Sequence, residues 1–456
     1  MPGTRTTLQL LREYESRNIT FMEPDGSWPI VWERAQGVHV WDAEGRKYLD
    51  LTAAFGVAAA GHANPRVVRA GQKQMARLLH AMGDVHPHAL KAELARRLSA
   101  LTFERWTAPN HTIARSPGNR QRARKAATTG KVIFTNSGFE AVEAALKTAL
   151  LATGKRGVIA FEGAYHGLGY GALNATHRAC FRQPFQAQLG KFGTFAPFPC
   201  LDGPARCSLA AVEAGLHRRL QRNDIGAILV EPIQARGGIN LPPPEFLPRL
   251  RALCDQSQTL LIFDEIYTGL GRTGKWFASE HSGTVPDLVC LGKALTGGFP
   301  LSACVGRADL MDAAWPASTG EAIHTSTFLG HPVGCAMALA ELAEIERLQL
   351  PERAAKLGEF LLADLRALPF PAGRLAGSPR GLGLMTGLEL TLPNGRPATA
   401  VALAAIKALL RRGYLFLPEG ADANVISFTP PLTITRAQLG EAVAALGAVL
   451  RRLAPR

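Results

Sequence analysis

Lys293 and Asp264 carry the side chains of this sequence that best suit covalent catalysis. Lys293 lies in the run Leu-Gly-Lys-Ala-Leu just after a short apolar segment, and Asp264 ends another apolar segment. A lysine among small and apolar residues is partly desolvated, which lowers its pKa and frees the amine to form a Schiff base. An aspartate at the end of an apolar strand can balance the charge of a buried heterocyclic nitrogen. Together they predict an anchor and a counter-charge for pyridoxal phosphate.

Each of these residues also has an ordinary interpretation, since a lysine after a strand is usually a solvated loop residue. The wider pattern favours a shared site. Short apolar runs alternate with helical patterns and end in polar or glycine-rich segments, at 131–135, 157–161, 227–230, 261–264 and 287–290. Such runs are typical of buried parallel strands in an α/β domain. Ligands bind beyond the carboxyl ends of such strands, so we expect one site there.

The segments at these strand ends resemble the motifs of class III aminotransferases, which are pyridoxal-phosphate enzymes of fold type I. The matching segments follow the family order and are 136–141, 163–167, 231–234, 264–274, 291–294 and 325–328. One such motif is weak, but six in order are specific, and weaker matches extend the resemblance over residues 20–440. The resemblance implies an α/β fold with a mostly parallel sheet in a large domain, a smaller α+β C-terminal domain, and a homodimer with its active site at the interface.

The resemblance also implies roles for individual residues. Lys293 would be the Schiff-base residue and would move the substrate proton, and Asp264 would keep the cofactor's pyridine nitrogen protonated. Ser137, Gly138 and Phe139 open a predicted helix at 140–151 and would bind the phosphate. Backbone N–H groups and the helix dipole suit a dianion at such a position. Phe139 departs from the family, which has a small residue there.

Further residues complete the implied cofactor site. Tyr165 would stack on one face of the pyridine ring and Ile266 would pack against the other. Glu231 resembles an acid that lies near the site. Thr327 resembles a threonine that reaches the phosphate from the other subunit, and this would make a dimer necessary for activity.

The substrate pocket departs from the family pattern. Many members pair an acidic residue with an arginine near the C-terminus, but these positions hold Arg236 and Ser427, so that pair is predicted to be lost. We hypothesise that Arg236 itself binds a substrate carboxylate, because a guanidinium matches one bidentately. The alternative is a surface arginine in a glycine turn. Phe55 falls at a pocket-lining position, and Tyr267 stands where glutamine is common. His331 stands before Pro332 where asparagine is common. The changes at Phe55, Tyr267 and His331 argue against an ordinary 4-aminobutyrate, ornithine or acetylornithine enzyme.

The domain organisation follows from length and the motif order. A chain of 456 residues that is 47% hydrophobic can bury the cores of two domains. We expect an N-terminal segment at 1–65, a large cofactor-binding domain at 66–330 with an insertion at about 103–130, and a C-terminal domain at 331–456. Within the last, 332–348 is predicted as a linking helix and 381–390 as one strand.

Charge, cysteine usage and hydropathy limit the partners. The net charge is +14, and basic residues cluster at 115–125 within the insertion. This cluster has little aromatic interleaving and no recognition-helix pattern follows it, so we expect a solvated loop and no nucleic-acid binding, with an acidic partner or carrier protein as the alternative. Seven cysteines are scattered without CxxC spacing, which favours reduced thiols in the cytoplasm over a metal site. No run reaches membrane-spanning length.

A nucleotide-binding motif can be rejected, and two functions other than transamination remain open. The glycines at 269–274 match GxGxxG, but Trp276 replaces the hydroxyl residue of a P-loop and no dinucleotide-type strand context follows. The main alternative is a racemase or epimerase on the same fold, which would need a second acid/base group opposite Lys293. A binding protein without catalysis is the other, and the presence of both Lys293 and Asp264 argues against it.

Overall fold

The computed structural model describes residues 3–108, 128–200, 207–370 and 373–453. The basic cluster at 115–125 lies outside these residues. The largest sheet has seven strands in the order β4-β10-β9-β8-β7-β5-β6. Their bounds are β4 Gly130–Thr135, β5 Gly157–Phe161, β6 Gly193–Ala196, β7 Ile225–Val230, β8 Leu260–Asp264, β9 Leu288–Leu291 and β10 Ser302–Arg307. The strand predictions are therefore confirmed to within two residues.

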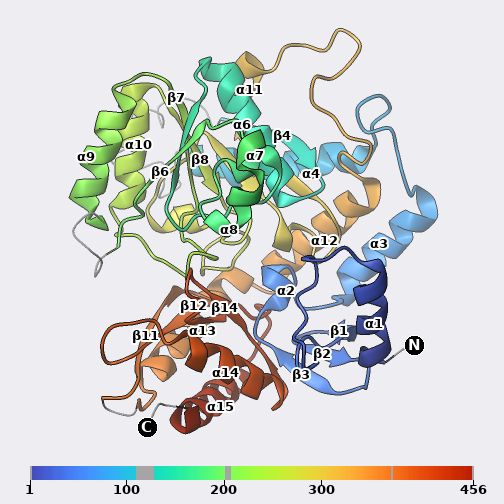
Figure 1. Ribbon diagram of the computed structural model, residues 1–456. Coiled ribbons are helices and arrows are strands. Elements are labelled where there is room, and N and C mark those ends of the chain that lie inside the picture. The colour runs from blue at the N-terminus through green and yellow to red at the C-terminus, as the bar shows by residue number, and fades with distance from the viewer. Residues whose placement is uncertain (1–2, 109–127, 201–206, 371–372, 454–456) are drawn as a thin grey trace.

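The sheet is parallel except at β10, which pairs antiparallel with both β9 and β4. The strand β10 is absent from the predicted runs. Because β10 runs opposite to its two neighbours, β4 points the same way as the other strands. The carboxyl ends of β4, β5, β7, β8 and β9 consequently lie at one edge of the sheet, and in Figure 1 this edge faces the C-terminal part of the chain.

Helix α6 (Gly138–Thr153) follows β4 and packs across the sheet. The Glu140 carboxylate accepts hydrogen bonds from the backbone N–H groups of Asn136 and Ser137, at 2.7 and 3.0 Å. These contacts hold the turn that starts the helix. Its buried face consists largely of alanines, which lets the helix lie close to the strands. The helix ends at Gly154, whose φ of 65° favours glycine.

The other helices cover the sheet and build the rest of the molecule (Figure 1). Helices α9 (Leu209–Leu220) and α10 (Phe246–Ser257) pack together at the side of the sheet. The remaining helices are α1 Thr4–Tyr14, α2 Ala53–Gly56, α3 Pro65–Arg77, α4 Ala89–Ser99, α5 Arg105–Thr107, α7 Tyr170–Leu173, α8 Ala179–Arg182, α11 Ala308–Ala314, α12 Pro332–Arg347, α13 Leu350–Arg366, α14 Thr399–Leu410 and α15 Arg436–Leu453. A short π-helical turn, η1 (Ala100–Glu104), continues α4.

The C-terminal part contains a sheet of order β11-β12-β15-β14, with bounds β11 Ala376–Leu382, β12 Met385–Thr391, β14 Leu417–Glu419 and β15 Val425–Phe428. The prediction of one strand at 381–390 is wrong. The chain reverses at Gly383, whose φ is 56°, and forms the turn of a β11–β12 hairpin. The apolar pattern continues through this turn because Leu384 is itself buried, so the sequence gives no polar break there.

The N-terminal strands join the C-terminal part through one small sheet. Its order is β1-β2-β3-β13, with bounds β1 Trp32–Gln36, β2 His39–Asp42, β3 Lys47–Asp50 and β13 Tyr414–Leu415. Strand β13 pairs parallel with β3, although the two are far apart in the sequence. Figure 1 shows the N-terminal strands beside the C-terminal elements accordingly.

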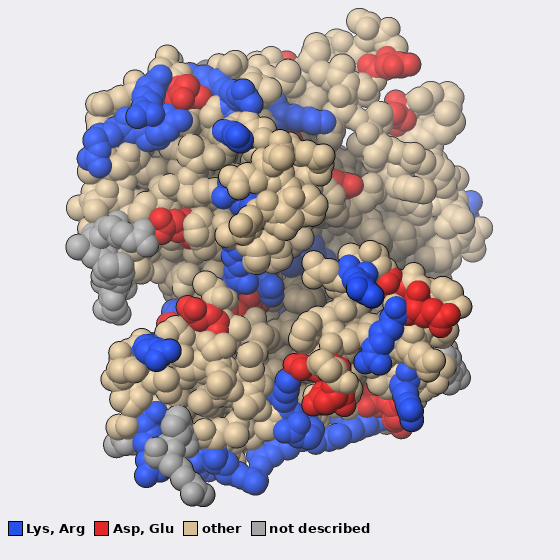
Figure 2. All heavy atoms as spheres, viewed as in Figure 1, with Lys and Arg blue, Asp and Glu red and all other residues tan. Residues whose placement is uncertain are grey.

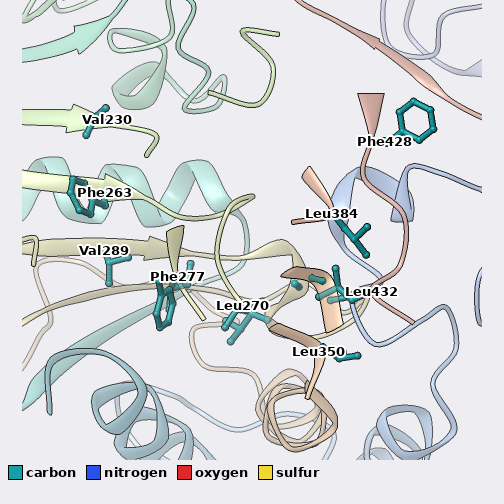
Figure 3. Packing of buried hydrophobic residues seen from close by; sticks show 14 of the residues in the cluster. Val230, Phe263, Leu270, Phe277, Val289, Leu350, Leu384, Phe428 and Leu432 are labelled. Atoms are coloured by element: carbon teal, nitrogen blue, oxygen red, sulfur yellow. The ribbon is translucent and has the colours of Figure 1, made fainter. Parts of the chain in front are cut away.

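One continuous hydrophobic core connects the large sheet to the C-terminal part (Figure 3). Val230, Phe263 and Val289 extend from the sheet, and Leu384 and Leu432 extend from the C-terminal part. All are almost completely buried. Truncating a buried phenylalanine costs about 3–5 kcal/mol, so this shared core holds the two parts together.

Among the residues that the structure describes, no helix is both long and apolar enough to cross a bilayer.

Figure 2 shows Lys and Arg side chains along the lower border of this face, over the C-terminal helices, and at the upper left, near α9 and α10. On this face, basic side chains therefore lie over both the large sheet and the C-terminal part.

Candidate active site

A cavity of about 390 Å³ opens at the carboxyl edge of the large sheet. Five strand ends contribute to it, since its lining includes residues that follow β4, β5, β7, β8 and β9. The lining residues are Gly138, Phe139, Tyr165, His166, Gly167, Leu168, Glu231, Ala235, Arg236, Asp264, Ile266, Tyr267 and Lys293. The structure therefore brings together nine of the residues singled out in the sequence.

Lys293 starts a short 3-10 turn directly after β9. Its φ of 41° lies in the left-handed region, which a non-glycine residue adopts at a cost of about 1–3 kcal/mol. The Nζ atom lies 4.5 Å from the centroid of the Tyr267 ring. Burial lowers the pKa of this amine, and the nearby carboxylates of Asp264 and Glu231 partly oppose that shift. A lowered pKa raises the fraction of neutral amine, which is the form that attacks a carbonyl carbon.

Asp264 is oriented by a histidine that the sequence analysis left without a role. Its Oδ2 atom lies 2.8 Å from Nδ1 of His166, and its Oδ1 accepts a hydrogen bond from the backbone N–H of Ile266 at 3.1 Å. Both side chains are buried. The Nε2 atom of His166 finds no hydrogen-bond partner among the residues that the structure describes. The motif 163–167 pointed to this loop, but only the fold brings β5 and β8 together.

Glu231 holds the loop that carries the aromatic wall of the cavity. Its carboxylate accepts hydrogen bonds from the backbone N–H groups of Tyr165 at 3.0 Å and Ala235 at 3.1 Å. Burial raises the pKa of Glu231. The ring of Tyr165 makes an edge contact with Phe181, at 5.6 Å between centroids. Glu231 therefore acts on the cavity through the position of Tyr165.

The start of α6 forms one corner of the cavity. The hydroxyl of Ser137 is buried without a hydrogen-bond partner in the described parts of the chain. A Cβ atom on Gly138 would lie 3.0 Å from the Ile266 side chain, so this position favours glycine. The large ring of Phe139 lies against Gly169, where an added Cβ would come within 2.4 Å of the ring. This glycine makes the space that the Phe139 side chain needs.

These features fit pyridoxal phosphate. The free Ser137 hydroxyl and the open N–H groups of the first turn of α6 suit its phosphate. The buried Asp264 carboxylate suits a protonated ring nitrogen, and Lys293 supplies an amine for the aldehyde. Tyr165 and Ile266 line the same cavity and can cover the two faces of a planar ring.

Tyr267 forms part of the cavity lining. Its hydroxyl lies 3.1 Å from Oγ1 of Thr429. Burial raises the pKa of Tyr267 to about 12, so the phenol stays protonated. Its ring packs against Gly56, where a Cβ would approach to 2.3 Å and where φ is 82°. The tyrosine in place of the expected glutamine is thus matched by a glycine from the N-terminal segment.

The family pair at positions 236 and 427 is absent, as expected, but Arg236 has another partner. Its Nη1 atom lies 3.3 Å from Oε2 of Glu419, at the end of β14. The charges are reversed relative to the family pattern, because the arginine now lies on the loop after β7 and the acid lies on the C-terminal sheet. Glu419 is 2% exposed, and burial raises its pKa to about 7. Sequence spacing gives no sign of this partner, which is 183 residues away.

Three of the predicted residues do not line the cavity of this chain. Ser137, which precedes Gly138 at the start of α6, is not among the lining residues. Phe55 is 49% exposed, and its neighbour Gly56, rather than Phe55 itself, contacts Tyr267. Thr327 is exposed in a surface segment whose next residue, Phe328, is also exposed.

Comparison with known proteins agrees with this geometry. The family model for class-III aminotransferases matches residues 21–450. The 5-aminovalerate aminotransferase of Pseudomonas aeruginosa is 38% identical over 93% of this chain and 94% of its own length. The putrescine aminotransferase of Pectobacterium atrosepticum is 36% identical over 98% of this chain and 88% of its own length.

Solved structures give the same result. An (S)-enantioselective omega-transaminase from Thermomicrobium roseum superposes with a TM-score of 0.86 at 26% identity, covering 99% of both chains. An amine transaminase from an uncultivated Pseudomonas species, in its PLP-bound form, superposes with a TM-score of 0.82 at 29% identity, covering 96% of this chain and 98% of that one.

Proposed function

This chain belongs to the class III aminotransferases, pyridoxal-phosphate enzymes of fold type I, and from that premise we propose which of its residues perform the transamination. The enzyme moves an amino group between an amine or amino acid and a keto acid or aldehyde. The arrangement of Lys293 and Asp264 in one cavity is the observation that carries our assignment.

We assign Lys293 as the Schiff-base residue and as the group that moves the substrate proton. Its lowered pKa supports the second role, because a neutral amine can accept a proton. When bound, pyridoxal phosphate supplies an electron-withdrawing ring that stabilises negative charge on the substrate carbon. Asp264 keeps the ring nitrogen protonated, and His166 positions the Asp264 carboxylate through the 2.8 Å contact.

The other assignments follow the walls of the cavity. Tyr165 and Ile266 cover the faces of the ring, and Glu231 positions Tyr165. The phosphate is assigned to the start of α6, at Ser137, Gly138 and Phe139.

For the substrate we assign Arg236 to a carboxylate. Phe55 remains a proposed substrate contact. Because Phe55 does not line the cavity of its own chain, it would have to make this contact at the site of another copy.

A homodimer with shared active sites is proposed from the surface around Thr327. Large apolar side chains are exposed at Leu79, Met82, Val85 and Phe328. The two segments that carry them are joined by a 2.6 Å hydrogen bond from the Thr325 hydroxyl to Asp84. A contiguous exposed apolar surface is typical of a protein interface. We propose that this surface meets a second copy, whose phosphate site receives Thr327.

We keep the division into residues 1–65, 66–330 and 331–456 as a proposal for the domains, with the first joined to the last through β3 and β13. A cytoplasmic location is proposed from the scattered cysteines of the sequence.

The amino donor is proposed to carry a primary amine on a terminal methylene group. The similar proteins are named for 5-aminovalerate and putrescine, which share that feature. To test the function, purified protein is mixed with pyridoxal phosphate and a panel of amines, and the visible absorbance band is followed. Loss of the band with a donor and its return with a keto acid is the expected result. A band that persists while the substrate proton exchanges with solvent would identify a racemase. Absence of any band would refute the assignment of Lys293 as the Schiff-base residue.

A further inference from the structure

We propose that the Arg178–Arg236–Glu419 cluster makes the cavity select donors whose far end carries a carboxylate and reject diamines. This inference rests on the proposed aminotransferase site and specifies its substrate class. It begins with the charges at one wall. Arg236 lies in that wall, and Arg178 and Glu419 contact it from outside the cavity lining. With two guanidinium groups and one acid, the cluster carries at least one net positive charge.

Arg236 cannot leave the wall easily, because both its backbone and its side chain are held. Its carbonyl oxygen accepts hydrogen bonds from the Gly420 backbone N–H at 3.2 Å and from Nη2 of Arg178. Arg178 also donates to the Gly420 carbonyl at 2.7 Å. The guanidinium carbon lies 5.9 Å from the centroid of the Tyr165 ring, which faces the cavity. A positive charge is therefore a permanent part of this wall.

Glu419 pairs with Arg236 from outside the cavity lining, so it does not offer a binding site for a substrate cation. It lies on β14, where it is paired in register with Val425 of β15, and its side chain is 2% exposed. It is absent from the cavity lining, whereas Arg236 is part of it. A substrate ammonium group would therefore meet the guanidinium before it could reach the carboxylate.

The other acids of the cavity do not reverse this preference. Both oxygens of Glu231 already accept backbone hydrogen bonds, and burial raises its pKa. Asp264 contacts His166 through one carboxylate oxygen and accepts a hydrogen bond from the Ile266 N–H with the other. A carboxylate at the far end of the donor would gain a charge-assisted bond to Arg236, and an ammonium in the same place would meet a like charge in a partly desolvated site.

The test compares three donors of equal chain length whose far ends are a carboxylate, a methyl group or an ammonium: 5-aminopentanoate, 1-aminopentane and 1,5-diaminopentane. Loss of the visible absorbance band of the pyridoxal-phosphate enzyme is measured without a keto-acid acceptor, so that only the donor half-reaction is observed. We expect kcat/KM to fall in that order, with about 100-fold or more between carboxylate and ammonium. Equal rates for the first and last donor would overturn the inference.

Variants assign the effect to the cluster. Arg236→Gln should reduce the preference for the carboxylate over the ammonium donor at least 10-fold, mainly through KM. Glu419→Gln should keep the preference for carboxylate, because it removes the only negative charge of the cluster. Arg249→Gln, on the outer surface where Arg249 pairs with Glu213, is the matched control and should change nothing. An unchanged ratio in Arg236→Gln would contradict the inference.

Binding of pentanoate, measured by calorimetry on the holoenzyme, separates this inference from the proposed reaction. Charge selection predicts that pentanoate binds wild type and is weakened about 10-fold or more in Arg236→Gln. If pentanoate binds in this way while no donor bleaches the band, the proposed transamination of these donors fails and charge selection stands. If pentanoate binds both proteins equally, charge selection is wrong whatever the activity.

Discussion

The Nη1 atom of Arg236 lies 3.3 Å from Oε2 of Glu419, and this contact joins the loop after β7 to the C-terminal sheet. The acid is almost completely buried and the arginine is partly exposed to the cavity. The pair therefore couples the charge of the substrate wall to the ionisation of a single buried carboxyl group.

Stability should depend on pH through Glu419. Its pKa is raised from the ordinary 4.5 to about 7 by burial, partly opposed by Arg236 and Arg178. The neutral Glu419 carboxyl therefore contributes its full share of the unfolding free energy below the pKa of the unfolded chain, 4.5. That contribution is lost as the pH rises from there through the folded-state pKa of about 7. Relative to wild type, Glu419→Gln should gain on the order of 3 kcal/mol of unfolding free energy across this window. Denaturant unfolding at several pH values measures the difference, and parallel curves would contradict the shift.

Substitution of Lys293 should abolish both the reaction and the covalent link to the cofactor. Lys293→Ala removes the only lysine that lines the cavity in the described residues. We expect no detectable turnover and a band that matches free pyridoxal phosphate with non-covalent binding. Lys131→Ala is the control, because Lys131 is an exposed lysine that pairs with Asp312 at the edge strand. A normal band in Lys293→Ala would show that another residue forms the link.

His166 should act through Asp264 and not on the substrate. His166→Ala removes the 2.8 Å partner of the carboxylate and should weaken cofactor retention and lower kcat by about 10-fold. Asp264→Asn should lower kcat by about 100-fold or more, because the amide cannot balance a protonated ring nitrogen. His166→Asn, which restores an N–H donor, should recover part of the loss. The cofactor dissociation rate and the pH titration of the band separate this role from simple loss of folding, and an unchanged titration in His166→Ala would argue against it.

Mixed dimers should show whether Thr327 serves the partner's site. Lys293→Ala and Thr327→Val are each expected to reduce activity, the latter through weaker phosphate binding. Hybrids formed by mixing the two variants contain one site with both changes and one with neither. Activity of the mixture should therefore exceed that of either variant alone. Failure to exceed them, with hybrids confirmed by mass, would place Thr327 in the site of its own chain.

The local pattern of the sequence determined the parts of the site that depend on neighbours in the chain. Apolar runs end at Asp264 and shortly before Lys293, and parallel strands place such ends at one edge. The start of α6 was predictable for the same reason, since helix start signals lie within a few residues. These features depend on periodicity and termini, which the sequence displays directly.

Only the tertiary structure decided which distant side chains meet. His166 reaches Asp264 across the ends of β5 and β8, and Glu419 reaches Arg236 over 183 residues. Strand β10 also escaped prediction, because its sequence SACVGR consists mostly of small residues. The reversal at Gly383 escaped prediction because the apolar pattern continues through the turn. Burial gives such contacts their strength, since charges that leave water must find a partner. That partner is chosen by packing in three dimensions, which residue spacing along the chain does not record.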